Sequence, residues 1–117
     1  MKSVFQGMTY LILLSAASIA GAVEIRNGTE AEIAAIKKEM ETQLKDADSA
    51  KIMNLRLVKE ESGSFFCGLV NSKNSYGAYA GYEPFNGLKF DRPGGKDLYF
   101  VAGIGEAAGK VCKDHGL

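Results

Sequence analysis

Three tyrosines that closely follow two asparagines and a lysine are the side chains of this 117-residue chain best suited to recognition chemistry. Tyrosine supplies rigid stacking area and a hydroxyl group, while amides and an ammonium group supply directional hydrogen bonds. Such a mixture suits recognition of a protein surface or of a sugar chain such as cell-wall glycan. The alternative is that the asparagines only bond to their own backbone in turns and that the tyrosines only cover a sheet. The candidate binding residues are Asn71, Lys73, Asn74, Tyr76, Tyr79 and Tyr82.

Side chains that could act as acids, bases or metal ligands are scattered along the chain. A glycosidase needs two carboxylates held across a cleft, whereas Glu60 and Glu61 are adjacent and therefore diverge. His115 is expected to be a solvated residue of the C-terminal tail. No spacing of His, Cys and Asp residues suits a metal site. We therefore expect no enzymatic activity, no catalytic residues, no metal and no cofactor.

The two cysteines, Cys67 and Cys112, are expected to form a structural disulfide. Closing a loop of about 46 residues would lower the conformational entropy of the unfolded chain and so stabilise the folded state by roughly 4 kcal/mol. A redox or nucleophilic thiol is the alternative, but the chain has no C-x-x-C motif and only His115 as a possible base.

Residues 1–22 have the pattern of a secretory signal peptide. Lys2 provides a basic start, residues 10–19 form an apolar stretch, and Ala20-Gly21-Ala22 matches a cleavage site. A retained membrane anchor is the alternative, but the apolar stretch is short for a span of roughly 20 residues. We expect residues 23–117 to be a single domain exported to the periplasm or outside the cell, with no membrane span after cleavage.

The charge balance argues against a nucleic-acid partner. The chain has 14 basic and 14 acidic side chains, and removal of the signal peptide takes away one base, Lys2. Nucleic-acid binding normally requires a concentrated basic face that releases phosphate counterions. We therefore expect a protein or glycan partner and no nucleic acid.

A capping box predicts where the first helix begins. The Thr29 hydroxyl can accept from the backbone N–H of Glu32, whose carboxylate can reach back to the N–H of Thr29. Apolar residues then recur at helical spacing, with charged residues between them. We expect an amphipathic helix of about four turns that packs in the core rather than on a membrane or a partner. Its apolar stripe is Ile33, Ile36, Met40 and Leu44.

Alternating segments predict an antiparallel sheet after this helix. Residues 52–59 and 65–71 are predicted to form a hairpin around the turn at 60–63. One face of this sheet would pack on the helix and the other would remain wet. The side chains expected to share one face of the first strand are Met53, Leu55 and Leu57.

The remaining segments complete the sheet and the C-terminal end. Aromatic residues recur every third position from Tyr76 to Phe85, with Gly77 and Gly81 between them, which predicts a bulged strand. A turn at 92–97 precedes a last strand at 98–104, and residues 23–28 form a short lead-in. The predicted fold is α+β: one long N-terminal amphipathic helix on an antiparallel sheet of about four strands, with a short C-terminal helix or turn tethered by the disulfide.

Parts of the chain resemble a group of small exported bacterial and phage-encoded proteins of unknown function. The shared pattern is a D-P-x-S-A-like turn followed by C-G-x-V-N-x-K-N-x-x-G-x-Y-x-G-x-x-P-F. Ala47 stands where that turn commonly has proline. The resemblance implies an exported α+β domain and no known activity. The matching residues are Asp46, Asp48, Ser49, Ala50, Cys67, Gly68, Val70, Asn71, Lys73, Asn74, Gly77, Tyr79, Gly81, Pro84 and Phe85.

Three functional hypotheses follow from the sequence. The first is a small exported binding or inhibitor module that acts in the periplasm or envelope on an envelope protein or an incoming protein, through its aromatic turn and without catalysis. The second is a structural accessory subunit of an envelope or phage-related assembly, docked by a sheet edge or by the same turn. The third, a cell-wall hydrolase, has the least support. The oligomeric state is left open.

Overall fold

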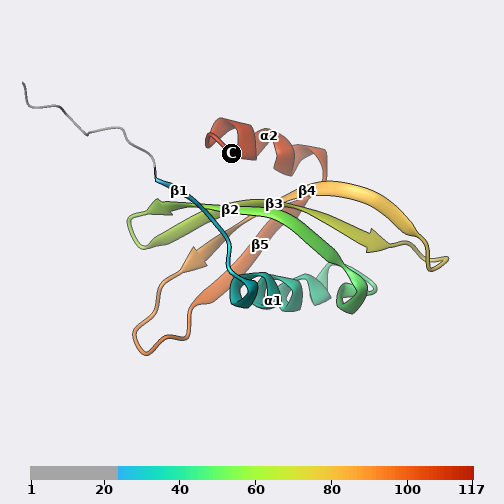
Figure 1. Cartoon of the computed structure of the whole chain (residues 1–117), viewed down its shortest axis with the longest axis horizontal. Helices are drawn as coiled ribbons and strands as arrows, with labels where there is room; N and C mark the ends of the chain where they lie inside the picture. Colours follow the sequence, from blue (N-terminus) through green and yellow to red (C-terminus); the bar gives the residue numbers. More distant parts are fainter. Residues whose placement is uncertain (1–23) are drawn as a thin grey trace, which may run out of the picture.

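The computed structural model describes residues 24–117, which form a five-stranded antiparallel sheet between two helices (Figure 1). The predicted signal peptide, residues 1–22, lies outside the described residues. Two short 3₁₀ turns, Met40–Thr42 and Ala47–Ser49, connect the first helix to the sheet. In chain order the main elements are β1 (Ile25–Asn27), α1 (Glu30–Glu39), β2 (Lys51–Glu60), β3 (Gly63–Lys73), β4 (Tyr79–Phe90), β5 (Leu98–Ile104) and α2 (Glu106–Asp114).

The strands follow one another across the sheet in sequence order, and each is antiparallel to its neighbour. The predicted α+β class and the hairpin of β2 and β3 are therefore confirmed. The expected number of about four strands was one too low, because the lead-in forms β1. Ile25 of β1 pairs with Val58 of β2, so this edge strand exists only by virtue of a neighbour far along the chain.

The helix α1 begins as the capping box predicts. Thr29 Oγ1 accepts from the backbone N–H of Glu32 at 3.1 Å, and a carboxylate oxygen of Glu32 accepts from the N–H of Thr29 at 2.9 Å. Its 10 α-helical residues continue directly into the 3 residues of the 3₁₀ turn Met40–Thr42, and the two together come close to the expected four turns. Ile36 and Met40 are fully buried, and they fix this helix on the sheet.

The sheet carries a helix on each face, which corrects the expectation of one wet face (Figure 1). On the α1 face, Phe66 and Phe85 join Ile36 and Met40 in the main core. On the α2 face, Phe65, Cys67 and Cys112 form a second, smaller cluster with Leu88 and Leu117 packed against it. The alternation along β3 therefore divides its side chains between two cores, because neighbouring residues of a strand point to opposite faces.

A bulge in β2 overturns the expected grouping of Met53 with Leu55 and Leu57. The register shifts between Met53 and Arg56, and Asn54 adopts a positive φ of 55°. Leu55 and Leu57 are buried in the main core, whereas Met53 is 41% exposed. An extra residue in one strand changes which face the preceding side chains occupy.

The C-terminal segment is a helix, and the predicted disulfide holds it on the sheet. Cys67 of β3 and Cys112 of α2 are bonded, with their Cα atoms 6.0 Å apart. The backbone N–H of Gly105 donates to the Pro84 carbonyl oxygen at 2.8 Å where α2 begins. Gly109 lies so close to Pro84 that an added Cβ would be 3.0 Å from its ring. The helix thus crosses β4 at a glycine.

Candidate binding surface

The candidate binding residues lie at and beside the tip of the β3–β4 hairpin. Lys73 pairs with Tyr79 and Asn71 pairs with Tyr82, with a register shift between the two pairs. Gly81 absorbs this irregularity with a φ of 104°. A bulged strand was predicted here, and the bulge places Tyr79 and Tyr82, three positions apart, opposite residues on the same side of β3.

Both asparagines stabilise the hairpin through their side-chain oxygens. Asn71 Oδ1 accepts from the backbone N–H of Gly81 at 3.0 Å. Asn74 Oδ1 accepts from the N–H groups of Tyr76 and Ala78 at 2.9 and 3.1 Å. These bonds match the turn-forming alternative for the two side-chain oxygens.

Replacing Asn74 with alanine should loosen the tip of the hairpin. Two backbone N–H groups lose their acceptor, and the expected cost is about 1 kcal/mol of local stability because water can partly replace the lost bonds. Amide hydrogen exchange should become faster at Tyr76 and Ala78 and remain unchanged in the core of β3. Unchanged exchange at both amides would show that the Asn74 side chain does not order this turn.

The three tyrosines differ in how free they are to meet a partner. Tyr76 is 95% exposed, and Tyr82 is 45% exposed. The Tyr79 hydroxyl donates to the Ser49 carbonyl oxygen at 2.9 Å, and its ring lies 4.5 Å from Lys51 Nζ. Tyr79 therefore also ties the hairpin to the start of β2, whereas Tyr76 and Tyr82 have no such bond among the described contacts.

Tyr82 also lines a groove of about 780 Å³ between α2 and the sheet. Its apolar part includes Leu69, Pro84 and the Cys67–Cys112 disulfide, while charged side chains come from β2, β4 and α2. The charged residues of the groove are Arg56, Glu83, Glu106, Lys110 and Lys113. None of them was identified from the sequence, because the groove exists only where α2 docks on the sheet.

Arg56 occupies an unusual position in this groove. Its Nη2 donates to the main-chain oxygen of Leu117 at 2.9 Å. Its Nε is buried and has no hydrogen-bond acceptor within residues 24–117. Buried donors normally have a hydrogen-bond acceptor, and the Nε of Arg56 is an exception to this rule.

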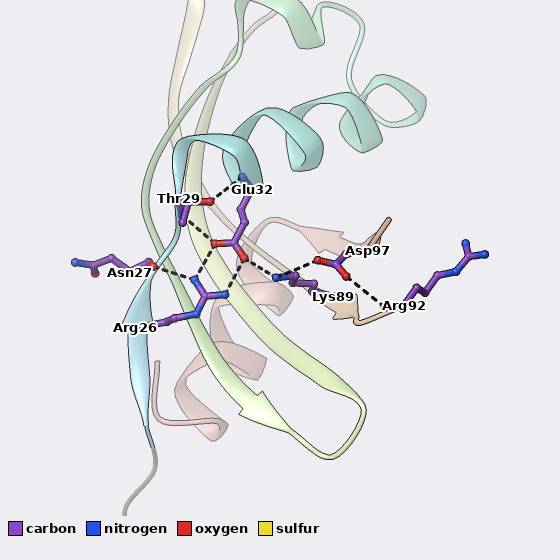
Figure 2. A network of polar contacts seen from close by, with 7 residues as sticks. All are labelled: Arg26, Asn27, Thr29, Glu32, Lys89, Arg92 and Asp97. Atoms are coloured by element: carbon purple, nitrogen blue, oxygen red, sulfur yellow. Dashed lines mark hydrogen bonds and ion pairs between the residues drawn. The ribbon is translucent and has the colours of Figure 1, made fainter. Parts of the chain in front are cut away.

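A second charged cluster, at the start of α1, joins four parts of the fold (Figure 2). The Glu32 carboxylate, in a residue that is only 5% exposed, accepts from Nη1 and Nη2 of Arg26 at 2.8 Å and from Lys89 Nζ at 2.9 Å. Lys89 also lies 3.5 Å from Asp97, in the turn before β5. Each charge faces an opposite one, so the cluster connects β1, α1, β4 and the β4–β5 turn and leaves little charge for a ligand.

The electrostatics of this cluster are dominated by Glu32. The hydrogen bond from Arg26 outweighs the effect of burial and holds the pKa of Glu32 far below its ordinary value of 4.5. Burial acts to lower the pKa of Lys89, but the Glu32 carboxylate more than compensates and leaves that pKa raised. Both groups are therefore charged at neutral pH, which stabilises the arrangement shown in Figure 2.

His115 is exposed but is not a free tail residue as expected. Its ring stacks on Phe65 with the centroids 3.9 Å apart, and its Nδ1 lies 2.9 Å from the Val111 carbonyl oxygen. The side chain thus covers the small core beneath α2.

Apolar side chains on β4 and β5 form an exposed patch that the sequence reasoning also missed. Phe90 pairs with Leu98, and Phe100 follows on the same face of β5. Phe90, Leu98 and Phe100 are 40%, 50% and 56% exposed. The available signal was the absence of charged residues between positions 98 and 104, a segment that was predicted only to be the last strand.

Comparisons with known proteins give no match: no family model, no curated protein and no solved structure is similar to this chain. Among residues 24–117, no helix is long and apolar enough to cross a membrane. The same part of the chain contains no group of at least three His, Cys, Asp or Glu residues that could hold a metal ion.

Proposed function

We propose that this protein is a small, exported, non-catalytic binding or inhibitor module that recognises a partner protein through the tip of its β3–β4 hairpin. The supporting observation is Tyr76, whose side chain is 95% exposed at the end of a hairpin ordered by Asn71 and Asn74. A large aromatic side chain that packs on nothing contributes nothing to folding, whereas aromatic anchors dominate protein interfaces. A rigid turn lowers the entropy lost when such an anchor is bound.

The compartment is part of the same proposal. The Cys67–Cys112 disulfide would persist in an oxidising space such as the periplasm or the outside of the cell. An envelope protein or an incoming protein is the proposed partner there, and cell-wall glycan is the alternative ligand because sugars stack on tyrosine rings.

Loss of the two free tyrosines should abolish partner capture without unfolding the domain. The oxidised chain from residue 23 to 117 would be used in a pull-down from an envelope extract, beside the Tyr76→Ala/Tyr82→Ala variant. Two aromatic anchors removed from an interface centre should weaken binding by at least about 30-fold. Tyr79 is left intact because its hydroxyl bond to Ser49 makes it part of the fold.

Phe100→Ala is the matched control for this experiment, because Phe100 is an exposed aromatic residue on a different element. Capture should be unchanged by this substitution. If Tyr76→Ala/Tyr82→Ala still captures the partner, the hairpin tip is not the binding surface. If this variant loses the circular dichroism spectrum of the native chain, the two tyrosines stabilise the fold and the test does not support a binding role.

The accessory-subunit hypothesis has one specific observation in its favour. The patch of Phe90, Leu98 and Phe100 lies on β4 and on β5, which is an edge strand of the sheet. Exposed apolar residues at a sheet edge are typical of docking sites. However, Gln43 Nε2 donates to the Val101 carbonyl oxygen at 3.0 Å, and β4–β5 pairing is irregular at its centre. These two features obstruct strand addition at this edge, so we rank this function second.

A further inference from the structure

We propose that the groove beside α2 binds an acidic segment of the partner protein, with apolar side chains of that segment on the groove floor and its carboxylates against Arg56, Lys110 and Lys113. The inference rests on the proposed function, since Tyr82 lines the groove and belongs to the hairpin that carries Tyr76. It adds the chemistry of the partner to the surface already described.

The distribution of charge supports an acidic partner. The whole chain has equal numbers of basic and acidic side chains, 14 of each. In contrast, Arg56, Lys110 and Lys113 line the groove, and Lys51 and Lys73 continue the positive charge beside Tyr79. Two acidic residues, Glu83 and Glu106, share the groove. Basic residues therefore outnumber acidic ones three to two in the groove, and five to two when Lys51 and Lys73 are included, in a chain whose total charge is zero. Electrostatic complementarity then favours a negative partner.

Arg56 is positioned to bind a carboxylate. No Asp or Glu side chain among the described residues forms an ion pair with Arg56, although Arg26 and Lys89 both have acidic partners. Its bond to Leu117 orients the guanidinium, and the buried Nε places one edge of this group against the wall of the groove. A planar guanidinium that is fixed in advance binds carboxylates with little further loss of entropy.

The floor of the groove distinguishes a peptide from a uniform polyanion. Leu69, Pro84 and the disulfide present apolar surface, which a phosphate or sulfate backbone would not cover. Glu83 and Glu106 would repel an unbroken row of negative charges. A peptide can place its carboxylates at intervals and set apolar side chains between them. The volume of about 780 Å³ lies within the range of natural binding pockets and is sufficient for a few side chains.

Fluorescence anisotropy with a labelled peptide tests this inference. The probe is a short peptide in which Glu alternates with Gly and Leu, and the comparison probe carries Lys in place of each Glu. The oxidised chain should bind the acidic probe, and added salt should weaken the complex. The variant Lys110→Glu/Lys113→Glu should bind the acidic probe at least about tenfold more weakly.

Matched variants separate local charge from net charge and from folding. Lys38→Glu/Lys59→Glu changes the net charge equally on exposed residues away from the groove and should leave binding within about twofold. Lys110→Gln/Lys113→Gln avoids new acids at the end of α2 and should still weaken binding several-fold. Circular dichroism verifies that each variant is folded.

Several results would overturn the acidic-segment inference: equal affinity for the lysine probe, tighter binding of heparin or of an oligonucleotide than of the acidic probe, or no binding at millimolar concentration. The proposed function is judged separately. A partner protein that is lost with Tyr76→Ala/Tyr82→Ala but retained by Lys110→Glu/Lys113→Glu would leave the hairpin tip as the binding surface and exclude the groove.

Discussion

Removing the disulfide by Cys67→Ala/Cys112→Ala is expected to lower the free energy of unfolding by about 4 kcal/mol, the value for a closed loop of this length. The bonded residues are 45 positions apart, so the unfolded chain gains much freedom when the bond is lost. A small domain has only about 5–15 kcal/mol of net stability, and the loss should be plain in a denaturant titration at 25 °C. Reduction of the native chain should give a similar loss.

The loss should also be uneven along the chain. The helix α2 has only nine residues, too few for a stable isolated helix. Without the disulfide, its attachment depends on the close contact of Gly109 with Pro84, the stacking of His115 on Phe65, and the bond from Arg56 to Leu117. Amide exchange should therefore increase in α2 before it increases in β3. A change in unfolding free energy below about 1 kcal/mol, with α2 still protected, would contradict the tether.

The features that the sequence predicted well depend on short-range signals. The capping box of Thr29 and Glu32 spans one helical turn, and the turn between β2 and β3 is a local polar break between alternating segments. The disulfide had only one possible pairing within the chain. The candidate binding residues lie together at one hairpin because they are close in sequence. The interactions that form these features join residues close in sequence, except for the disulfide, for which no other pairing within the chain is possible.

The features that were missed depend on tertiary contacts. The three residues of β1 form a strand only beside β2, and Met53 turns outward because Asn54 adopts a positive φ. The groove requires α2 to lie on the sheet, so no local pattern joins Arg56 to Lys110. Glu32 and Lys89 are 57 positions apart, and the sequence assigned Glu32 only to its cap. Pairing between distant charges has no periodicity that could be recognised.

The charged cluster around Glu32 leads to the second large expected effect. Glu32→Gln should lower the free energy of unfolding at neutral pH by about 3 kcal/mol, because Arg26 and Lys89 lose a shared, largely buried anion. Glutamine can still accept from the N–H of Thr29, so the cap is retained and the charge is removed selectively. Glu30→Gln is the matched control: it lies in the same first turn, is exposed, and should change stability by less than about 0.5 kcal/mol.

The pH dependence of this effect has a definite sign. Because the folded-state pKa of Glu32 lies far below the unfolded value of 4.5, its contribution is fully present above pH 4.5 and is lost as the pH falls toward the folded-state pKa. In denaturant titrations between about pH 7 and about pH 2, the difference in free energy of unfolding between the native chain and Glu32→Gln should become smaller in the acidic part of this range. A constant difference at every pH would mean that Glu32 stabilises the fold through packing alone, and the ion pairs would then contribute nothing measurable to joining α1 to the sheet.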